Sequence, residues 1–147
     1  MAKDNNAENT NEREVLIDNL IQSRHPTFTL SLPLGNGKKI DIPLLHISYV
    51  EAQGAISILH MEAYKTKQFR IGQSIGDCET LLNSYAFARI HRKFIINLSC
   101  IKKLTKNNGS WKCNLICGTE IPIARRQQKP FFDSLNPAQF NRLSIVD

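Results

Sequence analysis

Between residues 28 and 124 the chain is divided into short runs of strand-forming residues by glycine, asparagine and proline. Apolar and polar residues alternate at 28–32 and 40–42, which predicts strands with one buried face. Gln53-Gly54 and the Asn-Asn-Gly segment 107–109 predict hairpin turns. The remaining strand-like runs are 46–52, 55–61, 69–71, 87–97, 99–104, 111–117 and 120–124. Short strands in direct succession favour a mainly β domain over a parallel α/β sheet.

A few segments have helical spacing instead. Ser74 precedes apolar residues at helical intervals up to Leu82, and Asp77 follows it by three residues, which predicts a capped helix. An apolar stripe predicts a short amphipathic helix within residues 12–25, because the residue before Pro26 disfavours helical backbone. The segment 125–135 predicts one or two final helical turns.

These patterns divide the 147 residues into three parts. Residues 1–25 are expected to be an arm, disordered at first and then helical, because their first ten residues are rich in asparagine and charge. Residues 26–135 are expected to form one β domain. Residues 136–147 are expected to be a short, loosely packed tail.

Positive charge is concentrated in one structured part of the chain. The segment 89–129 has ten Lys or Arg residues and a single acidic residue, Glu120, so it carries +9, whereas the whole chain carries +6. Basic residues alternate there with strand-forming apolar residues. This combination is typical of a protein that binds a polyanion, most often nucleic acid. A solvated basic face is the alternative explanation that charge alone leaves open.

Other functional classes find little support in the sequence. The cysteines form no Cys-x-x-Cys pair, and Cys113 and Cys117 are expected on one face of a strand, as buried reduced thiols. The acidic residues form no nucleophile, acid–base or phosphate-loop pattern, so no enzyme, metal site or cofactor is expected. No apolar run approaches the roughly 18 residues of a membrane span, and no signal peptide is visible, which predicts a cytoplasmic protein without membrane insertion.

Four segments in a fixed order resemble the LytTR DNA-binding domain of bacterial transcription regulators. They are ISYVEAQGAISIL, RIGQSIGDCETLL, FARIHRKFIINLSCIKKL and GTEIPIARRQQKPFFDSL, and the match runs from about residue 28 to 135. RIHRKFIIN is the most specific segment. Lys93-Phe94 stands where the family usually has Ser-Tyr, and Ala124 stands where it usually has Ser before the two arginines.

The resemblance implies an elongated β fold of small sheets with one short flanking helix. It also implies sequence-specific binding of duplex DNA, with loops that enter successive major grooves and bend the DNA. The DNA-contacting positions carried over from the family fall in three places, namely Gln53, Gly54 and Ala55; His91, Arg92 and Lys93; and Arg125 and Arg126.

The chemistry of these side chains suits that role. Arg92 and Arg126 are expected to read bases, since arginine can bond guanine O6 and N7 together. Arg125 and Arg126, if they extend a strand, would point in opposite directions, so that only one reaches the bases. Weaker phosphate contacts are expected from Arg89, Lys102, Lys103 and Lys129. Asn97 is expected to cap or turn the backbone, and Trp111 to lie in the core.

Two further functions remain open at this stage. One is a LytTR-like interaction module that binds DNA weakly and is regulated through residues 12–25; the other is a single-stranded nucleic-acid binder. The 25 residues before the domain are too few for a phospho-receiver domain, so the stand-alone chain is expected to be controlled by its level, by homodimerisation on repeated half-sites, or by a separate protein inhibitor or activator.

Overall fold

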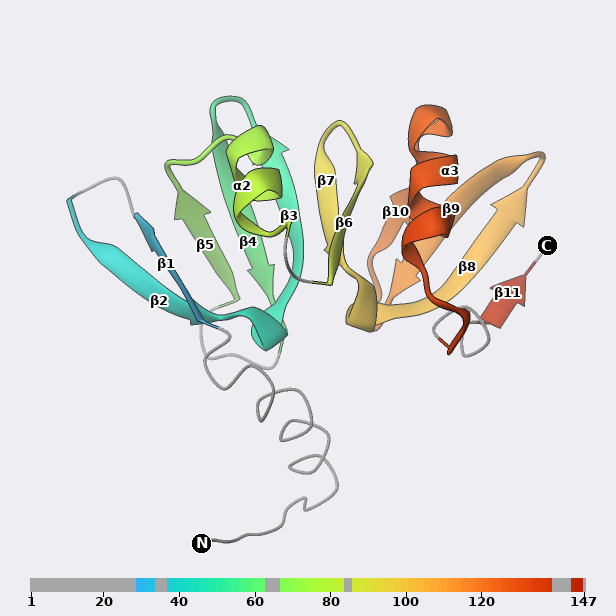
Figure 1. Cartoon of the computed structure of the whole chain (residues 1–147), viewed down its shortest axis with the longest axis horizontal. Helices are drawn as coiled ribbons and strands as arrows, with labels where there is room; N and C mark the ends of the chain where they lie inside the picture. Colours follow the sequence, from blue (N-terminus) through green and yellow to red (C-terminus); the bar gives the residue numbers. More distant parts are fainter. Residues whose placement is uncertain (1–28, 34–36, 63–66, 84–85, 139–143, 147) are drawn as a thin grey trace, which may run out of the picture.

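A computed structural model describes residues 29–33, 37–62, 67–83, 86–138 and 144–146 (Figure 1). The predicted N-terminal helix lies outside these residues. The first half contains β1 (Thr29–Pro33), β2 (Lys39–Pro43), the 3-10 turn η1 (Leu44–His46), β3 (Ile47–Gln53), β4 (Ile56–Met61), β5 (Gln68–Ile71) and α2 (Ile75–Leu81). The second half contains β6 (Phe87–His91), β7 (Phe94–Asn97), η2 (Leu98–Cys100), β8 (Ile101–Asn107), β9 (Ser110–Leu115), β10 (Glu120–Pro122), α3 (Arg125–Ser134) and β11 (Ser144–Val146).

The strands form three small sheets that lie side by side along the length of the molecule (Figure 1). A two-stranded sheet pairs β1 with β2. The central sheet has five strands in the order β5-β4-β3-β7-β6, and the third has four in the order β10-β9-β8-β11. The prediction of an elongated, mainly β fold is therefore confirmed.

The central sheet separates two hydrophobic cores. Ile95 and Ile96 are neighbours in β7, and both are almost completely buried. Ile95 packs with Val50 in a core beneath α2, whereas Ile96 packs with Phe131 of α3 in the second core. Successive strand residues point to opposite faces, so a strand that is apolar at consecutive positions is covered on both sides. The strand β7 thus connects the two halves of the domain.

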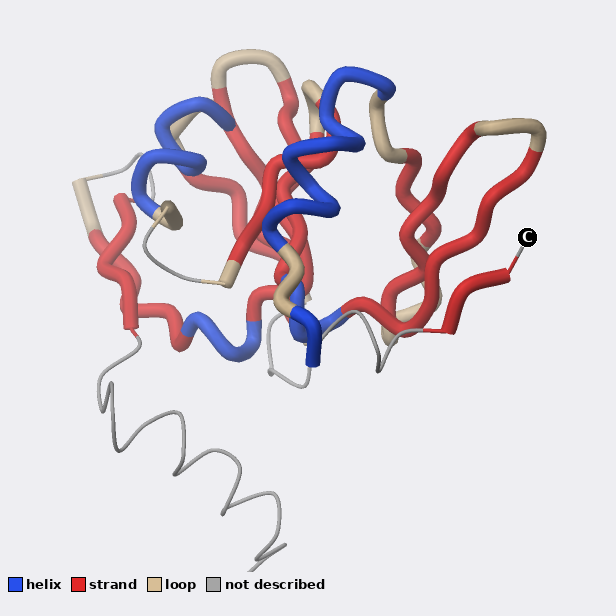
Figure 2. Tube along the Cα trace, turned by 45° about the vertical axis from the view of Figure 1, so that its right-hand side comes forward, coloured by secondary structure: helices blue, strands red, loops and turns tan. Residues whose placement is uncertain are grey.

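Two helices flank the described sheets, and both lie where helical segments were predicted. The N-terminus of α2 is capped as predicted, because the Ser74 hydroxyl accepts a hydrogen bond from the Asp77 backbone N–H at 3.1 Å. The second helix, α3, is longer than the predicted one or two turns. It packs against β6 and buries Phe131 in the second core. Figure 2 shows both helices in blue and the strands in red.

The predicted turns are largely confirmed, with one omission. Hairpins join β3 to β4 and β8 to β9, and Asn108 and Gly109 both have positive φ, as the tight β8–β9 turn requires. The run 87–97, expected as one extended segment, is instead the hairpin of β6 and β7. The run 99–104 begins within η2 rather than in a strand.

The C-terminal region also differs from expectation. Ser144–Val146 pair with Lys103–Thr105 as a parallel edge strand, whereas the tail was expected to be loosely packed. Backbone pairing of three residues requires no apolar run, so the sequence pattern did not indicate it. None of the helices in the described residues is both long and apolar enough to cross a membrane.

Candidate nucleic-acid interface

The three segments expected to contact DNA lie along one edge of the molecule. The β3–β4 turn, the β6–β7 turn and the N-terminal end of α3 all face the upper edge in both orientations (Figures 1 and 2). The β8–β9 turn reaches the same edge at one end. We call this the loop edge. Segments separated by more than 30 residues in the sequence are thus brought to one side of the fold.

Backbone hydrogen bonds tie the three segments to one another. The Ala52 N–H donates to the carbonyl of Lys93 at 2.8 Å, which joins the β3–β4 hairpin to the β6–β7 turn. The Ala124 N–H donates to the carbonyl of Ile90 at 2.8 Å, which joins the start of α3 to β6. The first bond attaches the β6–β7 turn to β3 two residues after the buried Val50, and the second attaches the start of α3 to Ile90 of β6, which is itself buried. The loop edge is therefore positioned by the sheets rather than by the loops themselves.

The β6–β7 turn is held by a side chain. Arg92 and Lys93 form this turn, are exposed, and have no positive φ. Arg89 donates from Nε to the carbonyl of His91 at 2.9 Å and from Nη2 to the carbonyl of Arg92 at 2.7 Å. Its Nη1 donates to Glu79 Oε1 of α2 at 2.7 Å. Arg89, predicted as a weak phosphate contact, thus has three of its five N–H donors occupied within the chain.

His91 also supports the turn from within. Its Nδ1 accepts a hydrogen bond from the Lys93 backbone N–H at 3.1 Å, and its ring lies 5.6 Å from that of Phe94. Partial burial lowers the pKa of His91, and the positive charges of Arg92, Lys93 and Arg89 lower it further. A neutral ring is required for Nδ1 to accept this bond. The geometry favours His91 as a supporting residue whose Nε2 remains available.

Gln53, at the β3–β4 turn, is hydrogen-bonded to Arg70, which is not among the predicted DNA contacts. Its Oε1 accepts a hydrogen bond from Arg70 Nη1 at 2.7 Å. Arg70 lies on β5, opposite Ile58 of β4. The side chains of Arg70 and Gln53 are both exposed. Gly54 begins the turn with φ +66, and no heavy atom lies within 4 Å of the position a Cβ would take there. Gly54 and Ala55 are exposed at the tip.

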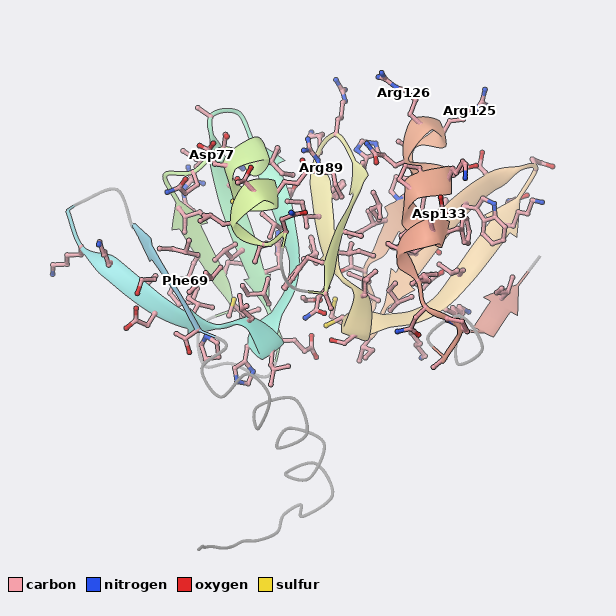
Figure 3. All side chains as sticks on the ribbon, in the orientation of Figure 1. Phe69, Asp77, Arg89, Arg125, Arg126 and Asp133 are labelled. Atoms are coloured by element: carbon pink, nitrogen blue, oxygen red, sulfur yellow. The ribbon has the colours of Figure 1, made fainter. Side chains whose placement is uncertain are left out.

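The paired arginines occupy a helix terminus. Arg125 and Arg126 are the first residues of α3, not strand residues, so the expectation that they point in opposite directions is wrong. Figure 3 shows both side chains extending beyond the end of the helix, away from the body of the domain. Ala124 is the N-cap and provides no side-chain hydrogen bond. Uncapped N–H groups and two guanidinium groups together form an electropositive end.

The structure does not gather at the loop edge the three lysines that were predicted to contact phosphate. Lys102 and Lys103 follow η2 at the start of β8, at the edge opposite to the loop edge (Figure 1). Lys129 lies one helical turn beyond Arg125 and pairs with Asp133 at 3.1 Å, with both side chains well exposed. The predicted phosphate contacts therefore do not form one group.

Asn97 and Trp111, which were predicted to have structural roles, lie in or beside the cores. Asn97 is buried; its Oδ1 accepts from the Ser99 N–H at 3.0 Å, and its Nδ2 donates to the carbonyl of Ile47, so its backbone-capping role is confirmed. Trp111 is half-buried and packs edge-on against Phe132, with ring centroids 5.1 Å apart. It belongs to the margin of the second core rather than its centre.

The cysteines differ from expectation at one position. Three are buried, and burial raises the pKa of the Cys113 thiol to about 12. Cys117 is exposed, and it lies in the turn after β9, not on the same strand as Cys113. Within the described residues, no group of three or more His, Cys, Asp or Glu side chains is arranged to hold a metal ion.

Comparison with known proteins identifies the family to which this fold belongs. A model of the LytTr DNA-binding domain matches residues 37–136, about two thirds of the chain. The chain belongs to the LytTr DNA-binding domain family. The match includes all three segments of the loop edge, and it ends just after α3. DNA binding through this domain is accordingly the general function of the chain.

Two relatives place the LytTr domain in context. The chain is 27% identical over 95 residues to the sensory transduction protein LytT of Oceanobacillus iheyensis, covering 60% of this chain but 37% of that protein. The chain thus spans well under half of that relative's length. The LytTr DNA-binding domain of a putative methyl-accepting/DNA response regulator from Bacillus cereus has the same fold, with a TM-score of 0.61, 22% identity, and coverage of 74% of this chain and 96% of that one.

Proposed function

We propose that this LytTr domain is a sequence-specific regulator of transcription that places its loop edge on one side of duplex DNA. In this proposal the β3–β4 turn and the β6–β7 turn enter one major groove, the N-terminus of α3 approaches the next, and the DNA bends toward the protein. The cytoplasmic location and the absence of catalysis predicted from the sequence belong to the same proposal.

One observation carries the proposal: the β3–β4 turn, the β6–β7 turn and the N-terminus of α3 share one edge and are joined by backbone hydrogen bonds, and the last two carry exposed cations. Arg92, Lys93, Arg125 and Arg126 are all exposed there. The bonds from Ala52 to Lys93 and from Ala124 to Ile90 fix the spacing of the turns before DNA arrives. A preorganised surface loses less conformational entropy on binding, so its contacts contribute more fully to affinity.

The side chains divide into two roles under this proposal. Arg92 at the tip of a hairpin can reach base edges and bond guanine O6 and N7 together. Arg125, with the uncapped N-terminus of α3, suits a phosphate, which carries negative charge toward exposed N–H groups. Arg126 extends beside it toward the groove. His91 and Arg89 hold the β6–β7 turn rather than contributing most of the contacts.

A binding-site selection on random duplex DNA tests the proposal. The expected result is a short motif, bound as two half-sites by two copies, with an affinity for scrambled duplex at least tenfold weaker. A circular-permutation gel with the selected site should show bending. Equal binding of duplex, single-stranded DNA and RNA would contradict it and favour a single-strand binder. Weak binding to every duplex would instead favour a protein-interaction module.

A further inference from the structure

We infer that Arg70 and Gln53 act together as one reading unit that selects guanine over adenine beneath the β3–β4 turn. The inference rests on the proposed function, because it assumes that this turn meets the edges of bases. It adds a specificity-determining residue, Arg70, and a base preference. Arg70 lies on β5, outside the three segments that the family resemblance brings to DNA.

The first step is the identity of the atoms in contact. Arg70 Nη1 lies 2.7 Å from the terminal amide of Gln53. A guanidinium group has only donors, so the amide atom facing it is the oxygen. The orientation of the Gln53 amide is therefore determined by chemistry. Its NH₂ group, which has two donor hydrogens, is the part left for another partner.

The second step is the position of the pair. Residues 51 and 53 share one face of β3, and Glu51 lies in register with Ile58 and, one strand further, with Arg70. Gln53 is the last residue of β3 before the turn, so Arg70 reaches it diagonally across β4. Both side chains are exposed at the loop edge. In the described residues no acidic side chain is paired with Arg70, which leaves its positive charge uncompensated by an ion pair.

The third step is the pattern that the pair presents. A free glutamine recognises adenine by accepting from N6 and donating to N7. Here the Gln53 oxygen already accepts a hydrogen bond from the Arg70 guanidinium group. The N6 amino group of an adenine that approached this oxygen would therefore bring a hydrogen-bond donor toward a positive charge. Guanine presents two acceptors in the major groove, O6 and N7. The Gln53 NH₂ group and the remaining Arg70 N–H groups match those two acceptors.

The experiment compares base preference in three variants. Selection with the unmodified chain defines the site, and duplexes carrying each of the four base pairs at every position then give relative affinities. Gln53→Ala identifies the position beneath the turn. The expected preference there is guanine over adenine by at least fivefold. Arg70→Ala frees the Gln53 oxygen, and it should reduce or reverse that ratio at this position alone. Arg70→Lys, which keeps a cationic donor, should retain the order.

Three results would overturn the inference. They are an adenine preference at the Gln53-dependent position in the unmodified chain, an unchanged ratio in Arg70→Ala, and an equal loss at all positions, which would make Arg70 a phosphate contact. Specific binding that persists in those cases would leave the proposed function intact. Absence of any sequence preference in the unmodified chain would overturn both. Circular dichroism and thermal unfolding confirm that the exposed substitutions leave the fold unchanged.

Discussion

Arg89 joins Glu79 across the boundary between β6 and α2, with 2.7 Å between Nη1 and Oε1. The same guanidinium group holds the carbonyls of His91 and Arg92. One side chain therefore links the helix, the strand and the β6–β7 turn. The Arg89 side chain is 19% exposed, so these bonds are partly protected from water. Its position makes it a support for the loop edge.

The first prediction concerns this support. Arg89→Lys keeps the charge but loses the planar fork that bonds two carbonyls and a carboxylate together. The affinity for the selected duplex should fall about tenfold, which corresponds to about 1.4 kcal/mol. The slope of affinity against salt should stay the same, because no phosphate contact is removed. Fluorescence anisotropy at several salt concentrations measures both quantities.

Glu79→Gln is the matched control for Arg89. It keeps a hydrogen-bond acceptor for Nη1 and leaves the two bonds to the turn in place. A smaller loss than in Arg89→Lys is expected. A salt slope that becomes shallower in Arg89→Lys, or an unchanged affinity, would assign Arg89 to another role.

The second prediction is a strong dependence of duplex affinity on salt. Exposed cations at the loop edge are Arg70, Arg92, Lys93, Arg125 and Arg126. If four or five of these cations lie against the DNA and each displaces close to one counterion, log K should fall against log salt with a slope of about −4 for each bound copy. Titrations in potassium chloride give this slope. A value shallower than about −2 would be inconsistent with extensive phosphate contact.

The third prediction separates the loop edge from the rest of the basic segment. Arg92→Ala should cost about 1–3 kcal/mol on the selected site and relax the preference at one base pair. Lys102→Ala should change the affinity less than about twofold, because β8 begins at the opposite edge. Titrations against the selected and the scrambled duplex measure both. Equal losses for Arg92→Ala on the two duplexes would exclude base reading by Arg92.

Sequence patterns predicted most of this fold because its turns carry strong local signals. Gly54 and the Asn108-Gly109 pair have the positive φ that tight turns require, and few other residues adopt it. The β6–β7 hairpin was missed because Arg92-Lys93 has no such signal. That turn is held by Arg89, whose partners come from residues 79, 91 and 92, and a contact between separate elements has no local pattern.

The candidate site was also predicted only in part. The residues carried over from the family lie on one edge, because the resemblance already contained their spatial relationship. Lys102 and Lys103 were selected by charge alone, and the structure places them elsewhere. Arg70 was missed because its link to Gln53 depends on the order of β5, β4 and β3 in the sheet. Strand order is not visible in the periodicity of any single strand.

The fourth prediction concerns the two cores joined by β7. Ile96 is fully buried in the second core, whereas Ile116 is 58% exposed. Ile96→Ala should lower the free energy of unfolding by about 2–5 kcal/mol, because it removes buried methyl groups and leaves a cavity. Ile116→Ala removes the same atoms from the surface and should change it by about 0.5 kcal/mol or less. Chemical denaturation followed by circular dichroism compares them.

The fifth prediction concerns pH. His91 has a pKa lowered from its ordinary value of 6.5, because partial burial and three neighbouring cations disfavour the charged ring. The unfolded chain therefore binds the proton more tightly than the folded chain. The stability that neutral His91 contributes is present above pH 6.5, and it is lost as the pH falls from there through the folded pKa. Titration of the ring carbons by NMR should place the midpoint below 6.5 in the DNA-free protein.

His91→Asn separates this effect from that of the other histidines. An asparagine side chain can accept the bond from the N–H two residues on, but it does not titrate in this range. As the pH falls below 6.5, the unfolding free energy of the unmodified chain should therefore decrease relative to that of His91→Asn. A constant difference across that range would mean that the turn does not depend on a neutral ring. A folded-state midpoint above 6.5 would show that protonation stabilises the turn, and would restore His91 as a cationic contact for phosphate.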